Sequence, residues 1–446
     1  MRTQSYHYLV AIILIAALYA TTAHGDIRKT SAVITTASRV KHVFIIVLEN
    51  KSFNDTFETS AQDPYLQRIL TPKGALLKQY YGTGHVSLDN YISMISGQAP
   101  TKDTANDCLP GSSGGLGNFN DVELVGTESN GQVIAKGGCI YPASVKTIVE
   151  QMSSAGLSWK AYMEDMGNDP AREGATCGHP SIGLGTDNTN NAEPPSAAVP
   201  IGDAYATRHN PFMYFHSIID SPECQKRVVN LNRLSADLRH PTITPNLVFI
   251  TPNVCHDAHD GAGTGAPGTT CVNHEPGGLT SADAFLRKWV PQILHSAAYR
   301  KDGLFIITFD ESDVILNERK DPNTEKITRD SIFPGLSCCD EQPGPNLKGV
   351  RPGVLNLVNS STLNWNVVIQ GYGGDRIGAL LLSRFVKAGS ASNVPYNHYS
   401  LLRTLEDMFG LPQHLGYAAD NPASGYHVDS ISNDANVWLP APSGTR

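Results

Sequence analysis

Short uncharged runs of apolar residues alternate with amphipathic stretches along most of the chain. The clearest run, 43–48, is rich in β-branched residues, and comparable runs occupy 246–251 and 304–309. Runs this short are typical of strands buried on both faces of a parallel sheet. Helical spacing lies between and after them, at 144–156, 281–296 and 400–409. The alternation predicts one α/β domain with a mostly parallel central sheet flanked by helices.

Each buried run ends in side chains that can bind a metal ion. They are Glu49 and Asn50 after the first run, Asn253, His256, Asp257, His259 and Asp260 after the second, and Asp310 and Glu311 after the third. Open α/β sheets place their active sites at the carboxyl ends of parallel strands. Oxygen and imidazole ligands in this arrangement indicate a divalent metal centre. A capped helix start would also explain the first group, and a calcium loop would also explain the second.

A serine and an asparagine lie at the start of a predicted helix. Ser87 is the first residue of an amphipathic stretch that buries Tyr91, Met94 and Ile95, and Asn90 follows three residues later. Free backbone N–H groups at a helix N-terminus bind anions and favour an alkoxide. Ser87 beside a metal is therefore a candidate nucleophile, although an ordinary capping serine has the same position.

Two histidines also lie at element boundaries. His209 precedes the aromatic-rich run 211–218 and is a candidate phosphate ligand, with a purely structural role as the alternative. His398 lies between a predicted last strand in 373–386 and the helix 400–409. It is a candidate metal ligand or phosphate contact, and a structural role is again the alternative.

The N-terminus has the pattern of a secretory signal peptide, residues 1–25. Arg2 precedes the apolar stretch 9–20, and small residues follow up to Ala23. Twelve apolar residues are few for a membrane span, so we expect cleavage near Ala23 or Gly25 and a secreted or lumenal protein, with an uncleaved anchor as the alternative.

Cysteine usage agrees with export. The chain has eight cysteines, all after residue 25, and an even number in an exported chain predicts disulfides. Cys108–Cys139 and Cys255–Cys271 are plausible local pairs, whereas the neighbours Cys338 and Cys339 are expected to have different partners. Sequons at Asn54 and Asn359 predict a glycoprotein.

Charge and composition restrict the partners and the domain organisation. The net charge is -8 and no basic run is present, which argues against nucleic acid as a partner. Segments 165–200 and 318–352 are polar and rich in Gly and Pro or Asn, and we expect loops or surface insertions there. No linker or internal repeat divides the chain. Residues 416–446 are expected to form a C-terminal surface tail.

Eight motifs together resemble a known family. They are HVFIIVLENKSF, HVSLDNYISMISGQ, YMEDM, RHNPFMYF, TPNVCHDAHDG, IITFDES, GALLLSRFV and NHYSLLRTLEDMFGL. Their order along the chain resembles that of the alkaline phosphatase superfamily. Their amino-acid sequences resemble its phosphoesterase branch, which holds secreted acid phosphatases, phosphatidylinositol-3-phosphatase-like enzymes and bacterial phospholipases C. The resemblance covers roughly residues 40–415. It implies an alkaline-phosphatase-like three-layer fold and one catalytic domain over that range.

The resemblance also assigns roles by motif. The first metal would be held by Glu49, Asn50, Asp310 and Glu311, with the Ser87 oxygen as nucleophile and Asn90 on the phosphate. Relatives with two metals hold the second at positions that correspond to Asn253, Asp257 and His398. Asn253 replaces the expected aspartate, so His256, His259 or Asp260 are the substitutes. The Cys/Ser-x-Pro-x-Arg signature of the sulfatase branch is absent.

The resulting expectation is a secreted, metal-dependent phosphomonoesterase that acts through a phosphoseryl intermediate, with His398 or the metal orienting water. Its substrate would be a small phosphate ester or a phospholipid or phosphoinositide head group. A phospholipase C-type phosphodiesterase is the alternative activity. A secreted metal-binding glycoprotein without catalysis is the alternative of another class. The identity and number of metals and the oligomeric state stay open.

Overall fold

The computed structural model describes most of the chain after residue 35. The described residues are 36–58, 62–109, 119–183, 189, 191–266, 268–349, 352–421 and 425–440. The predicted signal peptide, 1–25, lies outside them. Within the described residues, we find no helix that is long and apolar enough to cross a membrane.

An eight-stranded, mostly parallel sheet forms the centre of the domain. Its strand order is β15-β2-β14-β9-β1-β8-β6-β7, and only the pairings of β14 are antiparallel. The strands are β1 (His42–Leu48), β2 (Ala75–Leu77), β6 (Trp159–Met163), β7 (Val228–Asn230), β8 (Leu247–Thr251), β9 (Gly303–Phe309), β14 (Ala379–Leu382) and β15 (Ser390–Ser392). The three uncharged runs are β1, β8 and β9, and they are neighbours. All seven residues of β1 are buried, because β1 has a partner on each side and helices on both faces.

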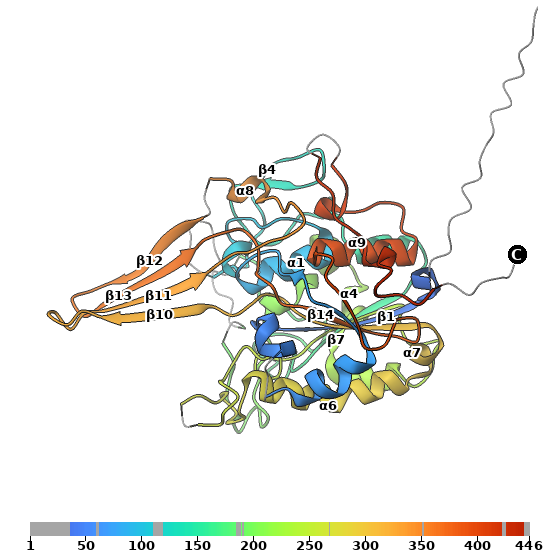
Figure 1. Ribbon diagram of the computed structural model, residues 1–446, viewed down its shortest axis with the longest axis horizontal. Helices are drawn as coiled ribbons and strands as arrows, with labels where there is room; N and C mark the ends of the chain where they lie inside the picture. The colour runs from blue at the N-terminus through green and yellow to red at the C-terminus, as the bar shows by residue number, and fades with distance from the viewer. Residues whose placement is uncertain are drawn as a thin grey trace, which may run out of the picture. The chain divides into compact units, whose positions relative to one another are not determined.

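Helices cover both faces of this sheet, which confirms the predicted α/β layers. Figure 1 shows α1 and α9 on one face and α6 and α7 on the other. The helices are α1 (Ser87–Ser96), α2 (Ile148–Ser154), α3 (His216–Ile219), α4 (Cys224–Arg227), α5 (Leu234–Asp237), α6 (Gly278–His295), α7 (Ala297–Asp302), α8 (Gly344–Leu347) and α9 (His398–Phe409). The helix α2 is shorter than predicted and begins after a capping box formed by Thr147 and Glu150.

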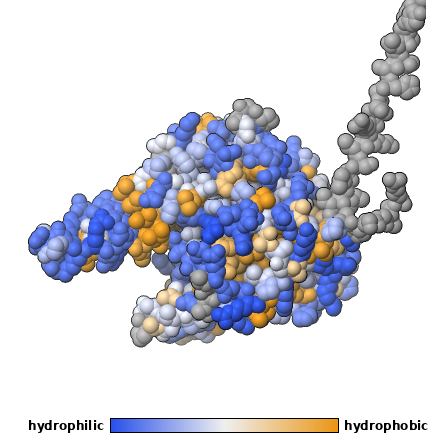
Figure 2. Space-filling view, viewed as in Figure 1, coloured by the Kyte–Doolittle hydropathy of each residue, from blue (hydrophilic) through white to orange (hydrophobic). Residues whose placement is uncertain are grey.

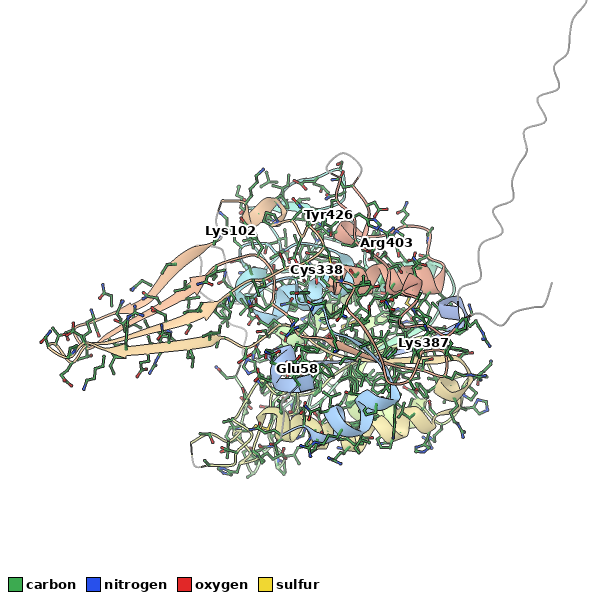
Figure 3. All side chains as sticks on the ribbon, viewed as in Figure 1. Glu58, Lys102, Cys338, Lys387, Arg403 and Tyr426 are labelled. Atoms are coloured by element: carbon green, nitrogen blue, oxygen red, sulfur yellow. A yellow bond between two sulfur atoms is a disulfide. The ribbon has the colours of Figure 1, made fainter. Side chains whose placement is uncertain are left out.

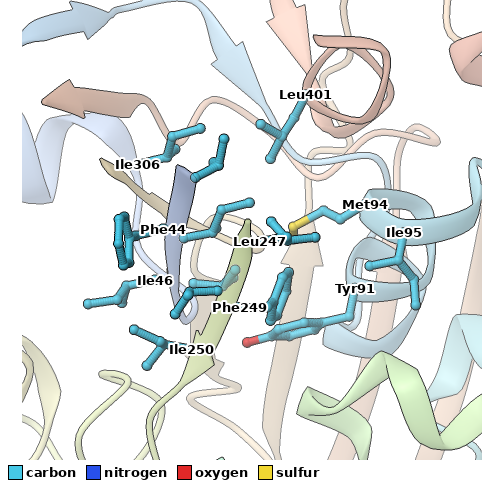
Figure 4. Close-up of a cluster of buried hydrophobic side chains, with 14 of the residues drawn as sticks. Phe44, Ile46, Tyr91, Met94, Ile95, Leu247, Phe249, Ile250, Ile306 and Leu401 are labelled. Atoms are coloured by element: carbon cyan, nitrogen blue, oxygen red, sulfur yellow. The ribbon is translucent and has the colours of Figure 1, made fainter. Parts of the chain in front are cut away.

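The core lies between the sheet and these helices. Phe44 of β1 contacts the ring of Tyr299 in α7, with centroids 6.3 Å apart. In Figure 4, Phe249 of β8 lies toward Tyr91 and Met94 of α1, on the opposite side of the sheet. All ten residues of α1 are buried. This helix is therefore packed firmly against the sheet, and Ser87 is its first residue.

The charged segment after β9 folds as a second sheet, where we had expected only a surface insertion at 318–352. Its order is β10-β11-β13-β12, formed by β10 (Ile315–Lys320), β11 (Ile327–Phe333), β12 (Gly353–Asn359) and β13 (Leu363–Ile369). Figure 1 shows these strands apart from the central sheet, and all six residues of β10 are exposed. The strands pair with one another and not with the core, which explains why charged residues or Asn interrupt their apolar residues. The far end of this sheet is hydrophilic (Figure 2).

Two small sheets complete the strands. They are β3 (Tyr80–Tyr81) with β16 (Tyr396–Asn397), and β4 (Leu124–Thr127) with β5 (Val133–Ala135). The β4–β5 hairpin lies in the polar loop that the Cys108–Cys139 disulfide closes.

All eight cysteines are paired, as predicted for an exported chain. Cys108–Cys139 and Cys255–Cys271 form the predicted local disulfides, and Cys177 pairs with Cys224. The expectation for Cys338 and Cys339 was wrong, because they pair with each other. The other six cysteines already have partners, so only the neighbour remains. Figure 3 labels Cys338 in the segment that follows β11.

The segment after residue 415 is more than a surface tail. Val428 and Val437 are fully buried, Ile431 is 1% exposed, and all belong to core clusters. Val386 forms a bridge with Trp438. The described part of this segment therefore contributes to the hydrophobic core.

Candidate active site

Four predicted site residues meet at the carboxyl edge of the central sheet. The Ser87 hydroxyl donates to Glu49 Oε2 at 2.8 Å, and the Asn50 backbone N–H donates to Asp310 Oδ1 at 3.0 Å. The His398 Nε2 lies 2.6 Å from the main-chain oxygen of Asp310. All of these side chains except Asn50 are buried. The predicted convergence of Glu49, Ser87, Asp310 and His398 is confirmed, while their roles remain predictions.

The backbone is strained beside three of the site residues. Asn50 follows Glu49 with a φ of 52°, and Ala258 follows Asp257 with a φ of 87°. Val86 precedes Ser87 with a φ of 87°, a conformation that is rare for a β-branched residue. Such strain persists only where the surrounding structure over-determines it, and it concentrates at functional sites. The three turns thus hold their neighbours in fixed positions.

Glu49, Asp257 and Asp310 form a buried group that we call the acidic centre. The Glu49 N–H donates to the Asp257 main-chain oxygen at 2.7 Å, which brings the two strand ends together. Burial raises the pKa of Glu49 well above its usual value, and the charges of Asp310 and Asp257 raise it further. Burial also raises the pKa of Asp257 and of Asp310. Three carboxyls crowded in this way favour a bound cation.

Two further observations fit a metal at the acidic centre. Asp310 Oδ2 is buried without a hydrogen-bond partner among the described residues. The His209 Nδ1 lies 3.0 Å from Asp257 Oδ2, and its Nε2 lies 3.4 Å from Glu49 Oε1. Burial lowers the pKa of His209 well below its usual value, so the imidazole is neutral and able to ligate. Ligand atoms of Glu49, His209 and Asp257 lie within 4.8 Å of one another.

His209 was predicted to bind phosphate, and its position also suits a metal ligand. Its ring stacks on Tyr91, with centroids 5.5 Å apart and planes at 14°. The Tyr91 hydroxyl donates to Glu49 Oε1 at 2.5 Å. Tyr91 thus orients both groups. The sequence marked it only as a core residue of the helix, because nothing in the helical spacing shows that its hydroxyl reaches the site.

His398 contacts the site through the main chain of Asp310. The Tyr80 hydroxyl lies 3.0 Å from Nδ1, and the Asp310 main-chain oxygen lies 2.6 Å from Nε2. Burial lowers the pKa of His398 to about 4, so the ring is neutral and donates through Nε2–H to Asp310. Nε2 thus holds the main chain directly after β9, while Nδ1 accepts from Tyr80 of β3.

Two predicted ligands point elsewhere. Glu311 pairs with His85, which also lies 2.7 Å from Asp375 Oδ2. Burial opposes the charge on His85, but Glu311 and Asp375 raise its pKa to about 9, so a buried ion pair forms there. Asn90 accepts the Thr83 N–H at 2.7 Å and donates to the Gly84 oxygen at 3.0 Å. In this arrangement Asn90 holds the turn before Ser87.

A second group after β8 is separate from the acidic centre. His256 Nδ1 lies 2.8 Å from Glu164 Oε2, and Nε2 lies 2.7 Å from Glu275 Oε2. We call Glu164, His256 and Glu275 the outer network. Asn253 lies beside the outer network, because its Nδ2 donates at 2.7 Å to Oδ2 of Asp165, the residue that follows Glu164. The structure does not bring His256 or Asn253 to Glu49.

The outer network borders a cavity of about 350 Å³, which Phe285 and Lys288 of α6 also line. The adjacent Cys255 is held in a disulfide and is not a free ligand.

His259 lies at the rim of the acidic centre. Its ring centroid is 5.7 Å from that of His209, and its Nδ1 bonds to Asp260 Oδ1 at 2.8 Å. Arg208 Nη2 lies 3.4 Å from His259 Nε2, so a buried cation adjoins the site. Arg208 directly precedes the predicted His209, yet its sequence position did not single it out.

Arg208 is connected to the start of α1. Its Nε lies 3.6 Å from Asp107 Oδ2, while Asp107 Oδ1 accepts the Leu88 N–H at 2.8 Å. Leu88 directly follows Ser87. Asp107 and Leu88 are 19 positions apart in the chain, so no helical or strand spacing could have revealed this contact.

Curated proteins are similar in sequence to part or most of this chain. The phosphate-repressible acid phosphatase of Penicillium chrysogenum is 25% identical over 260 residues, which are 58% of this chain and 46% of that protein. The acid phosphatase of Aspergillus fumigatus is 24% identical over 277 residues, 62% of this chain and 46% of that protein. The chain thus spans about half the length of these acid phosphatases. The phosphatidylinositol-3-phosphatase of Mycobacterium tuberculosis is 21% identical over 425 residues, 94% of this chain and 93% of that protein.

Among solved structures, a protein in the alkaline phosphatase superfamily from Vibrio parahaemolyticus has a TM-score of 0.42 at 12% identity, covering 84% of this chain and 67% of that chain. Residues 59–412 match the model of the Phosphoesterase family. Since this range is well over half of the 446 residues, the chain belongs to the Phosphoesterase family, as the motifs at its strand ends predicted.

Proposed function

We propose that this chain is a metal-dependent phosphoric ester hydrolase of the acid phosphatase type, with Ser87 as its nucleophile. The observation that carries the proposal is the Ser87 hydroxyl, which donates to Glu49 at 2.8 Å at the first position of α1. A hydroxyl so placed has a carboxylate to receive its proton and a helix N-terminus to stabilise negative charge. Family membership and the acid phosphatase relatives support the same class of reaction.

The proposed reaction has two steps. In the first, the Ser87 oxygen bonds to phosphorus while the bond from phosphorus to the alcohol oxygen breaks. The Ser87 proton passes to Glu49 Oε2, and the departing alkoxide takes a proton from solvent. In the second, a water oxygen bonds to phosphorus and the bond to the Ser87 oxygen breaks; one water proton passes to solvent, the Ser87 oxygen takes back the proton from Glu49 Oε2, and hydrogen phosphate leaves.

The two carboxylate oxygens of Glu49 have different partners. Oε2 accepts from Ser87, while Oε1 faces Tyr91 and His209. A divalent cation held by Glu49, Asp257, Asp310 and His209 would neutralise phosphoryl charge and make the Ser87 oxygen more acidic. Asn50 stays beside Glu49 as a predicted ligand, since its Nδ2 donates to Oε2 at 3.1 Å.

Arg208 is the proposed partner of the substrate's remaining phosphoryl oxygens. Its guanidinium is buried, adjoins His259 and reaches the start of α1 through Asp107. Guanidinium groups bind phosphate through paired N–H donors. A phosphomonoester, with its extra negative charge, would benefit more than a diester, so we favour a phosphomonoesterase.

The compartment is part of the proposal. All eight cysteines are paired, which fits an oxidising, extracellular or lumenal environment. N-terminal sequencing of secreted material should find a start after residues 23–25. Finding Met1 there would contradict cleavage of the predicted signal peptide.

The test combines substrates, a chelator and a nucleophile variant. We expect wild-type protein to hydrolyse p-nitrophenyl phosphate faster than its bis ester or a phosphatidylcholine analogue, and to lose activity with chelator. Faster turnover of the bis ester or the lipid analogue would favour the phosphodiesterase alternative. No turnover of any of them would favour a metal-binding protein without catalysis.

Ser87→Ala should lower turnover by at least about 10³-fold while the protein stays folded. Ser96→Ala is the matched control, because Ser96 is a buried serine of the same helix whose hydroxyl donates to the Ile92 oxygen and accepts the Gln98 N–H. Labelled substrate quenched at low pH should label the peptide that contains Ser87. A label elsewhere, or wild-type turnover in folded Ser87→Ala, would overturn the assignment.

A further inference from the structure

Lys51 is a half-buried lysine directly behind the acidic centre. Its ammonium donates to the main-chain oxygen of Asn50 at 2.8 Å and to that of Ala258 at 3.0 Å. Both acceptors are thus backbone carbonyls. A charged donor makes stronger hydrogen bonds than a neutral one, so both contacts restrain the backbone they reach.

The two carbonyls belong to the two strained turns of the acidic centre. Asn50 has a φ of 52° and follows Glu49, whereas Ala258 has a φ of 87° and follows Asp257. For a residue other than glycine, such a conformation is unfavourable, less so for asparagine than for alanine, and needs compensating contacts. Lys51 supplies one contact to each turn at the same time.

Main-chain hydrogen bonds link the same elements. The Glu49 N–H donates to the Asp257 oxygen at 2.7 Å, and the Lys51 N–H donates to the Glu311 oxygen at 3.1 Å. The ends of β1, β8 and β9 therefore meet around Lys51. Its side chain adds a second connection from the turn after β1 to the turn after β8, one residue further along each turn than the Glu49–Asp257 bond.

We propose that Lys51 is a positioning residue that ties the two strained turns together and so sets the separation of the Glu49 and Asp257 carboxylates. The consequence for metal binding rests on the proposed function, whereas the consequence for the turns does not. Lys51 is assigned no contact with substrate. Its part is to hold a preformed cation site in place, against the mutual repulsion of the carboxylates.

A purely electrostatic role makes the opposite prediction. A nearby ammonium repels a divalent cation, so its removal alone would strengthen metal binding. Loss of a positioning contact would weaken metal binding, because the ligands would no longer be held at matching distances. The sign of the change in metal affinity therefore separates the two roles.

The first experiment follows hydrogen exchange of the metal-free protein. Lys51→Met should speed amide exchange about tenfold in both 49–53 and 257–261, the factor expected for the loss of one charge-assisted hydrogen bond. Lys51→Arg keeps the charge and donors and should stay near wild type. Lys160→Met is the matched control, because Lys160 is a partly buried lysine of β6 paired with Asp237 at 2.7 Å. Unchanged exchange in 257–261 of Lys51→Met would overturn the proposal.

The second experiment titrates Mn²⁺ and Zn²⁺ into metal-free protein by calorimetry. We expect binding to Lys51→Met to be at least about tenfold weaker than to wild type and to Lys160→Met. Equal or tighter binding would overturn the positioning role. If wild-type protein binds neither ion, the proposed function fails, and the exchange experiment alone still decides whether Lys51 ties the turns.

Discussion

Two neighbouring residues after β8 enter groups of opposite character. Asp257 joins the acidic centre, where burial and then the charges of Asp310 and Asp257 raise the pKa of Glu49, and Asp310 Oδ2 lacks a partner among the described residues. His256 joins the outer network, where each ring nitrogen already faces a carboxylate. The acidic centre has unbalanced charge that a ligand can satisfy, whereas the outer network is satisfied by its own members. An excess of one charge, more than the number of ligand-type residues, distinguishes a candidate site from a structural ion pair.

The largest expected difference between the two groups is catalytic. Asp257→Asn should lower kcat/KM by about 10²–10³-fold, since it removes a charged candidate ligand without changing the side-chain shape. His256→Gln should leave kcat/KM within about threefold, because His256 contacts the outer network. The measurement is p-nitrophenyl phosphate turnover at saturating metal, with circular dichroism as a check of folding.

Equal losses in both variants would contradict this division. That result would mean that His256 reaches the reacting groups during turnover, as its predicted role of substitute metal ligand would require. Calorimetric titration with Mn²⁺ then serves as an independent control, since only a ligand variant should lose metal affinity.

The next effect concerns Arg208, the buried guanidinium beside the acidic centre. Arg208→Gln should raise KM for a phosphomonoester about tenfold, because one charge-assisted contact to the phosphoryl group is lost. Arg208→Lys should recover only part of the loss, since an ammonium does not make the paired contacts of a guanidinium. Steady-state kinetics with p-nitrophenyl phosphate and its bis ester provide the comparison. A similar KM change for both esters would contradict recognition of the extra charge.

The strand ends could be predicted because buried parallel strands leave a strong local signal. Uncharged runs placed β1, β8 and β9, and the rule that site residues follow such strands led to Glu49, Asp257 and Asp310. The sequence could not show which residue of the turn 253–260 faces the centre. That choice depends on the geometry of the turn, such as the positive φ of Ala258. Alanine does not favour a positive φ, so its presence in the sequence does not predict this turn.

Other features depend on contacts between distant segments. His85 pairs with Glu311 and Asp375, although 226 and 290 positions separate them in the chain. The sheet of β10 to β13 lies outside the core, so β10 and β11 carry charged residues and Asn interrupts the apolar residues of β12 and β13, and none has the long apolar run of a buried strand. Patterns within a short window detect burial, and they miss pairing of this kind.

A smaller effect should appear in stability against pH. Burial opposes the charge on His256, but Glu164 and Glu275 raise its pKa to about 9. The folded pKa exceeds the unfolded value of about 6.5, so the stabilisation is fully present below pH 6.5 and is lost as the pH rises through 9. Urea unfolding should show His256→Gln less stable than wild type by roughly 2–3 kcal/mol at pH 6, with the difference much reduced at pH 9.5. A difference that does not change with pH would mean that the His256 charge contributes nothing.

The smallest effect separates the two carboxylates of the outer network. The Glu164 side chain is 11% exposed and that of Glu275 is 45% exposed, although their distances to the His256 ring nitrogens are similar. Glu164 Oε2 also accepts the Asn253 N–H at 3.2 Å, so its removal disturbs the turn that leads to Asp257. Glu164→Gln should therefore cost about 2 kcal/mol of unfolding free energy, and Glu275→Gln only about 0.5 kcal/mol, because water screens the exposed pair. Raising the salt from 0.05 to about 0.5 M should remove most of the Glu275 effect and leave most of the Glu164 effect. Equal costs with equal salt dependence would show that burial does not rank these ion pairs, and would weaken the use of burial to separate the outer network from the acidic centre.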